Sequence, residues 1–191
     1  DGALARAVGT QQAENLVRAD FEVHVVNRAG LGAHPEVAED LGQANGFDDA
    51  SAHRLALFAM HQMANVIASR SRHFAPAATN EEIGMAGVNG PVPVWLPSTM
   101  AGADPAIPKS WDMTSDSLAA WLAGKIGAKD VALVKSCAVD PAATLDDFTA
   151  SGIVDPLFRD YVEKLNLSWS VIGEGDDATL ARLVAASSER H

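Results

Sequence analysis

Residues 110–136, SWDMTSDSLAAWLAGKIGAKDVALVKS, decide the fold that we expect for this chain. Apolar residues recur there at helical spacing, at Leu118, Trp121, Leu122 and Ile126. They predict a helix with one apolar stripe facing a core. Gly127 ends this helix, and the continuous apolar run 131–134 predicts a strand covered on both faces. The stretch therefore indicates an α/β domain.

Polar residues mark both ends of this unit. Thr114 or Ser115 can cap the helix, and Asp116 in its first turn suits the positive helix end. Lys135 follows the predicted strand directly. In open α/β sheets, ligands bind where strands end and helices begin. We therefore expect Asp116 and Lys135 to lie together around one pocket at the carboxyl edge of the sheet.

Length and composition limit the class of protein. A chain of 191 residues fits one domain with a sizeable core. The net charge of −11 and the absence of a Lys/Arg cluster argue against nucleic acid or a membrane surface as the main partner. No apolar run approaches the roughly 20 residues of a membrane span. The single cysteine, Cys137, excludes an internal disulfide and fits a reducing cytosol, so we expect a cytoplasmic protein.

The rest of the chain alternates between the two periodicities. Strands are predicted over 21–26, 92–97, 131–134 and 167–172. Helices are predicted over 3–19, 35–44, 49–73, from about 115 to 126, before 165, and from 176 onward. The segments 74–92 and 97–109, rich in Pro, Gly and Ala, are read as loops. This alternation favours a mostly parallel sheet between helical layers.

A glycine-bearing turn follows the first of these strands. Gly30 and Gly32 can bring backbone amides close to an anion at a helix end, although an ordinary tight turn explains them equally well. His53 and His61 lie eight residues apart on the long helix. No Asp, Glu or Cys accompanies them at a recognised metal spacing, so they are interpreted as structural or adjacent to a substrate, and no metal-ligating residue is predicted.

The string TSDSLAAWLA followed by VALVKS resembles the amino-acid kinase superfamily, which includes aspartate, glutamate, acetylglutamate and uridylate kinases. The fuller pattern SWDMTSDS–AAWLAG–KS is more similar to the aspartokinase-like small-molecule kinases, which include the aminomethyl-furanmethanol-phosphate kinase of methanofuran synthesis. Residues 47–63, FDDASAHRLALFAMHQM, and 152–158, GIVDPLF, resemble stretches of that branch. The resemblance covers about residues 20 to 185. It implies a three-layer α/β/α sandwich with a mostly parallel central sheet.

The resemblance also implies a function and its residues. It implies a kinase that transfers phosphate from ATP, with Mg²⁺, to a small metabolite, itself phosphorylated or amine-bearing. Asp116 would orient the catalytic lysine or the acceptor, and Lys135 would neutralise nucleotide phosphates. The nucleotide side would include Gly30, Gly32, Lys135, Ser136 and Asp140. The substrate side would include Ser110, Asp112, Thr114 and Ser115.

Three features depart from the family pattern. Leu31 interrupts the glycine run, and Pro141 follows Asp140 where the family often has Val-Asp-Gly. The Lys-x-Gly-Gly-Ser segment that opens the family is absent, and the chain starts at Asp1. We therefore expect weak nucleotide binding and slow turnover from the chain as given. Three explanations of the missing segment stay open: a processed or incomplete chain, an inactive relative that binds without catalysis, or a need for a partner subunit. The alternative function is therefore a non-catalytic binding or structural subunit.

The long predicted helix also bears on assembly. Its apolar residues spread over more than one stripe: Leu55, Leu57, Phe58, Met60, Met63, Val66 and Ile67. A helix that packs one face on its own sheet needs fewer. We expect a homo-oligomer or a partner subunit with this helix at the interface, unless another helix of the same chain covers that side.

Overall fold

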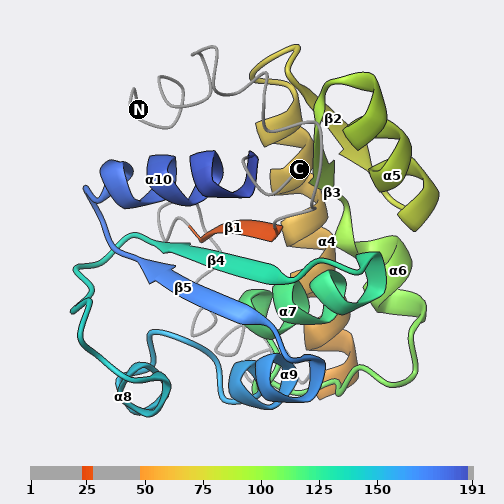
Figure 1. The fold of residues 1–191 in the computed structure, drawn as a ribbon. Coiled ribbons are helices and arrows are strands. Elements are labelled where there is room, and N and C mark those ends of the chain that lie inside the picture. Colours follow the sequence, from red (N-terminus) through yellow and green to blue (C-terminus); the bar gives the residue numbers. More distant parts are fainter. Residues whose placement is uncertain (1–22, 28–47, 189–191) are drawn as a thin grey trace.

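The computed structural model describes residues 23–27 and 48–188 of the chain, and Figure 1 shows its elements. The helices predicted over 3–19 and 35–44 lie outside the described residues, as do Gly30 and Gly32. The structure therefore gives no test of those elements or of the glycine turn.

A three-stranded parallel sheet forms the centre of the domain. Its order is β1 (Val23–Asn27), β4 (Asp130–Lys135) and β5 (Ser168–Ile172), with β4 in the middle. The strand register places Asn27 opposite Lys135 at one end of β4. Because β1, β4 and β5 are parallel, their carboxyl ends meet at this same edge of the sheet. The strands predicted over 21–26, 131–134 and 167–172 are confirmed within the described residues, as β1, β4 and β5.

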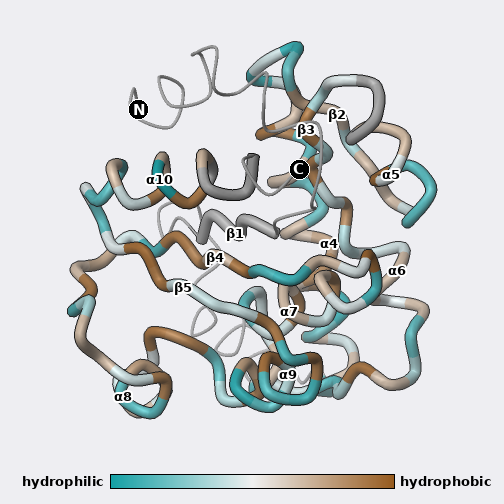
Figure 2. The backbone as a smooth tube through the Cα atoms, in the orientation of Figure 1, coloured by the Kyte–Doolittle hydropathy of each residue, from teal (hydrophilic) through white to brown (hydrophobic). Residues whose placement is uncertain are grey.

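Helices cover both faces of this sheet. Helices α7 (Ser115–Ile126) and α9 (Phe158–Leu165) lie on one side and α10 (Asp177–Ser188) on the other (Figure 1). This is the three-layer α/β/α arrangement with parallel strands that the sequence predicts. The hydropathy of the chain follows the layers, since β4 is largely hydrophobic and α9 carries many hydrophilic residues (Figure 2).

Helix α7 is buried more completely than one apolar stripe would require. Every residue from 116 to 123 is buried, including Ser117 on the polar side of the predicted stripe. The helix packs against β1 and β4 and also against α9, so neighbours surround it. Gly124 faces α9 closely, since a Cβ there would come within 2.8 Å of the end of the Leu165 side chain, which would have to move. The prediction of a one-sided helix was wrong for this reason.

A second, two-stranded parallel sheet pairs β2 (Phe74–Ala77) with β3 (Val92–Trp95). Helices α4 (Asp49–Ala68) and α5 (Asn80–Asn89) pack against both strands. Pro76 and Pro93 each occupy one of these strands, which is where proline is tolerated, because each strand of such a pair has one outer edge. Strand β3 was predicted; β2 was not.

Three short helices of the structure were not predicted from the sequence. Helices α5 and α6 (Pro97–Ala103) lie in the segments read as loops, and α8 (Leu145–Ala150) was not predicted. Local signals for them exist: the Thr79 side chain accepts a hydrogen bond from Glu82 N, and Pro97 begins α6 at a position that favours proline. Frequent Gly, Pro and Ala outweighed these signals in the sequence-based prediction.

Helix α4 starts where predicted and ends early. The Asp48 side chain accepts a hydrogen bond from Ser51 N at 2.7 Å, and the helix stops at Ala68 rather than near residue 73, because the chain turns there toward β2. Among its apolar residues Leu57 is buried, whereas Leu55, Phe58 and Val66 are about half exposed. The role of this helix in assembly stays a prediction. None of the helices within 48–188 combines the length and hydrophobicity needed to cross a bilayer.

Candidate functional site

A buried ion pair joins the start of α7 to the end of β4. Lys135 Nζ donates to both oxygens of Asp116, at 2.8 Å to Oδ1 and 2.7 Å to Oδ2. The two side chains are only 8% and 4% exposed. Helix α7 immediately precedes β4 and packs on the sheet beside it, so the first turn of the helix lies near the last residue of the strand. The predicted proximity of Asp116 and Lys135 at this edge is confirmed.

Burial sets the electrostatics of this pair. Removal from water raises the pKa of the Asp116 carboxyl above its ordinary value, and the carboxylate of Asp155 adds to this, while Lys135 acts against it. An ammonium group carries three N–H donors. Among the described residues only Asp116 accepts from Lys135, so one donor is left for a ligand.

Asp155 lies beside this pair and organises the backbone around it. Its Oδ2 accepts from Thr114 N at 2.8 Å, Thr114 Oγ1 at 2.9 Å and Ser117 N at 3.0 Å. Its Oδ1 accepts from Ser117 Oγ and from Phe158 N at 3.0 Å. Asp155 N in turn donates to Asp116 Oδ2 at 3.3 Å. One buried carboxylate thus satisfies donors at the starts of both α7 and α9 and contacts the ion pair.

This arrangement corrects the predicted cap of α7. Thr114 is the N-cap residue, but its side chain accepts no capping bond; its hydroxyl donates to Asp155 instead. The acceptor for the first-turn amide of Ser117 comes from 38 residues further along the chain. A buried helix start needs such an acceptor, and Thr114 is engaged as a donor.

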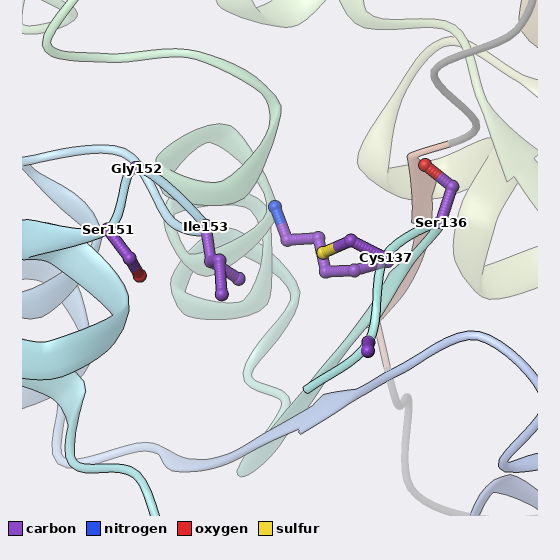
Figure 3. A pocket seen from close by; sticks show the side chains of 7 residues that line it. Ser136, Cys137, Ser151, Gly152 and Ile153 are labelled. Carbon is purple, nitrogen blue, oxygen red and sulfur yellow. The ribbon is translucent and has the colours of Figure 1, made fainter. Parts of the chain in front are cut away.

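An open cleft of about 440 Å³ adjoins Lys135. Its lining comprises Lys135, Ser136, Cys137, Ala138, Ser151, Gly152 and Ile153. Figure 3 shows Ser136 and Cys137, which follow β4, on one wall and residues 151–153, which follow α8, on the facing wall. The cleft thus combines one buried cation, hydroxyl groups and an apolar side chain, a composition suited to a ligand with both an anionic and an apolar part.

The loop after β4, which lines the cleft at Ser136, Cys137 and Ala138, is held by a close contact with the loop after β5. Cys137 O accepts a hydrogen bond from Glu174 N at 2.9 Å, joining the loops that follow β4 and β5. A Cβ at Gly173 would lie 2.8 Å from Val139 N, closer than real Cβ contacts allow. Only glycine therefore permits this approach.

The other residues predicted for the site are distributed unevenly. Ser110 Oγ donates to Asp112 Oδ2 at 3.3 Å, and Asp112 O accepts from Leu157 N at 3.1 Å, which ties this loop to the start of α9. Asp140 is exposed, and its Oδ1 accepts from Ala142 N at 2.8 Å within a turn. Of the predicted residues that the structure describes, only two line the cleft: Lys135 and Ser136. The residues predicted for the substrate side lie in the loop before α7 and at its first residue: Ser110, Asp112, Thr114 and Ser115. Asp116 contacts Lys135 but does not line the cleft itself. Their roles stay predictions.

Sequence reasoning missed two parts of this site. It assigned no role to Asp155 or to the wall formed by residues 151–153. A local signal exists, because the stretch 152–158, GIVDPLF, was noted for its resemblance to the kinase branch, and it includes Asp155 between Val154, which is buried, and Pro156. Nothing in that spacing shows that Asp155 meets a helix that starts some 40 residues earlier.

His53 and His61 do not line this cleft. His61 Nδ1 lies 2.6 Å from Ser98 Oγ, which joins α4 to α6. Burial lowers the pKa of His53, and its Nε2 has no hydrogen-bond partner among the described residues. Within residues 23–27 and 48–188, no group of three His, Cys, Asp or Glu side chains is placed to hold a metal ion.

The layers, the parallel strands and the helix order define an amino-acid-kinase-like α/β fold. Among solved structures, the chain is similar to the crystal structure of uridylate kinase from Archaeoglobus fulgidus, with a TM-score of 0.58 and 15% sequence identity. The match covers 93% of this chain and 86% of that one. No family model matches the sequence, and no curated protein does. At 15% sequence identity, this similarity shows that the two proteins share a fold and nothing more specific.

Proposed function

We propose that this protein is a small-molecule kinase that binds ATP in the cleft beside Lys135 and transfers phosphate to a small metabolite. The observation that carries the proposal is the buried Lys135–Asp116 pair, which opens onto a cleft at the carboxyl edge of a parallel sheet. The kinase-like fold and the sequence resemblance to the aspartokinase-like branch point in the same direction.

Each partner of the pair has a distinct role in this proposal. Asp116 is engaged by Lys135 through both oxygens, so it holds the ammonium in place rather than accepting a proton from a substrate. Lys135 directs its remaining N–H toward phosphate oxygens, where a charge-assisted bond stabilises developing negative charge. Phosphoryl transfer depends mainly on such positioning and charge stabilisation.

Magnesium fits this site only together with the nucleotide. Magnesium bound with the nucleotide would help to neutralise the negative charge of the phosphates. Asp116 is nearly inaccessible and already paired, and the described residues offer no metal-binding group of three side chains. Phosphate oxygens and water molecules would therefore supply most of the ligands, since this ion usually keeps several waters.

Cys137 provides a direct test, because it is exposed, lines the cleft and is the only cysteine in the sequence. The alkylation rate of Cys137 would be measured by mass spectrometry with and without Mg-ATP. We expect several-fold protection by Mg-ATP, loss of that protection in Lys135→Met, and unchanged protection in Lys129→Met, an exposed lysine before the other end of β4.

Phosphate transfer is then tested with ³¹P NMR, using pools of small alcohols, amines, carboxylates and phosphate esters as acceptors. A new phosphate ester, phosphoramidate or anhydride, formed only in the presence of a pool and of Lys135, supports the kinase. Protection of Cys137 without transfer to any pool would overturn catalysis and leave a binding protein. No protection at millimolar Mg-ATP would overturn the nucleotide site itself.

A further inference from the structure

We infer that Asp155 is a positioning residue of this site: it holds the Asp116 carboxylate, and through it the Lys135 ammonium, at the cleft. The inference rests on the proposed function for its biological meaning, but its physical content is a coupling between three buried groups. Asp155, Asp116 and Lys135 are all less than 10% exposed, and they come from three separate segments of the chain.

Asp155 is surrounded by hydrogen-bond donors. Five donors from Thr114, Ser117 and Phe158 converge on its two oxygens. A carboxylate that accepts so many bonds is fixed in orientation. Its chemistry is therefore that of an anchor rather than of an acid or base.

The anchor acts on Asp116 from two directions. By accepting from Ser117 N and Oγ, Asp155 fixes the first turn of α7, which carries Asp116. Through its own amide, Asp155 donates to Asp116 Oδ2, the oxygen that also receives Lys135 Nζ at 2.7 Å. The direction of the Lys135 ammonium therefore depends on a residue that does not touch it.

The same segment also forms the facing wall of the cleft. Residues 151–153 line the cleft, and Asp155 follows two residues later. The segment is secured on both sides of Asp155, because Ile153 N donates to Phe148 O at 2.8 Å and Phe158 is fully buried. The wall and the cation thus keep a fixed relation, as a site for a phosphate between them requires.

The coupling can be measured without any ligand, by competitive acetylation of lysines with trace acetic anhydride. Mass spectrometry gives the rate for Lys135 relative to Lys129, an exposed internal reference next to the same strand. In the wild type we expect Lys135 to react slowly, because its amino group is buried and donates to both oxygens of Asp116. Asp155→Asn should raise the relative rate several-fold, since the new amide group faces N–H donors and releases Asp116.

A second variant separates positioning from simple charge. Ser117→Ala keeps every charge and removes one donor to Asp155, so positioning predicts a smaller increase in the same direction. An increase in Asp155→Asn with none in Ser117→Ala would show a through-space charge effect and overturn the inference. If Asp155→Asn fails to fold, Ser117→Ala still decides the question.

Two controls exclude a general loss of structure. Thr79→Ala removes the cap of α5, outside the site, and should leave the relative rate unchanged. In an Asp116→Asn background, Asp155→Asn and Ser117→Ala should add nothing further, because both act through Asp116. A persistent effect in that background, or an equal effect of Thr79→Ala, would overturn the inference.

The two proposals fail separately. If Asp155→Asn changes Lys135 reactivity but Mg-ATP never protects wild-type Cys137, the coupling stands and the nucleotide site is wrong. If Mg-ATP protects Cys137 but Lys135 reactivity is the same in the wild type and both variants, the kinase site stands and the role of Asp155 is wrong.

Discussion

Helices α7 and α8 begin in opposite ways. At α8, Thr144 Oγ1 accepts from Asp147 N, and Asp147 Oδ2 accepts from Thr144 N at 2.8 Å, so four consecutive residues close the helix start. At α7 the equivalent acceptor is Asp155, about 40 residues away. A local cap forms wherever its sequence occurs. A remote cap exists only after folding, so the start of α7 and the adjacent ion pair are assembled by the tertiary structure.

The largest effect should follow loss of the remote cap. Asp155→Ala leaves buried donors at the starts of both α7 and α9 without an acceptor, so we expect a loss on the order of 4 kcal/mol in the free energy of unfolding. Urea denaturation followed by circular dichroism measures it. A loss no greater than that of a local cap would show that the two helix starts are equivalent.

The next effect depends on pH. Lys135→Met leaves Asp116 buried without its partner, and we expect a loss of about 3 kcal/mol near neutral pH. Burial already raises the pKa of Asp116, and removing Lys135 raises it further. The folded variant then keeps a proton that the unfolded chain releases near pH 3.8, so its stability falls as the pH rises above that value. The deficit relative to the wild type opens once the pH passes the raised pKa of Asp116 in the wild type.

Urea denaturation across this pH range, with Lys129→Met as the matched control, tests that sign. A deficit that is the same at acid and neutral pH would mean that removing Lys135 does not raise the pKa of Asp116 in the folded protein. In that case the start of α7 would differ from the start of α8 only in its packing and not in the ionisation of Asp116.

The smallest effect should follow loss of the local cap. Thr144→Ala removes the acceptor for Asp147 N at an exposed helix start, and we expect a loss of about 1 kcal/mol in the free energy of unfolding. Thermal denaturation measures it, and acetylation of Lys135 should not change. A change in Lys135 reactivity would show that the start of α8 also affects the ion pair. The local cap of α8 and the remote cap of α7 would then differ less in their effect on the site.

The sequence permits prediction of this fold where a signal is local and strong. The apolar run before Lys135 and the spacing of Leu118 and Trp121 were sufficient to place β4 and α7, and the order of elements was sufficient to bring Asp116 to Lys135. The role of Asp155 was not predicted, because tertiary packing and not sequence spacing brings its hydrogen-bond partners to it. Helices α5 and α8 were not predicted although Thr79 and Thr144 mark their starts, because short helices show only a weak periodicity of apolar residues.

The two prolines of the second sheet have a consequence for the behaviour of the protein at high concentration. Within the described residues β2 and β3 pair only with each other, so each has an outer edge to which a strand of another molecule could add. Pro76 and Pro93 have no N–H group, so each edge lacks one of the donors that an incoming strand would need. Replacing them with residues that restore these donors would favour intermolecular sheet growth, and the prolines therefore protect this part of the molecule from aggregation.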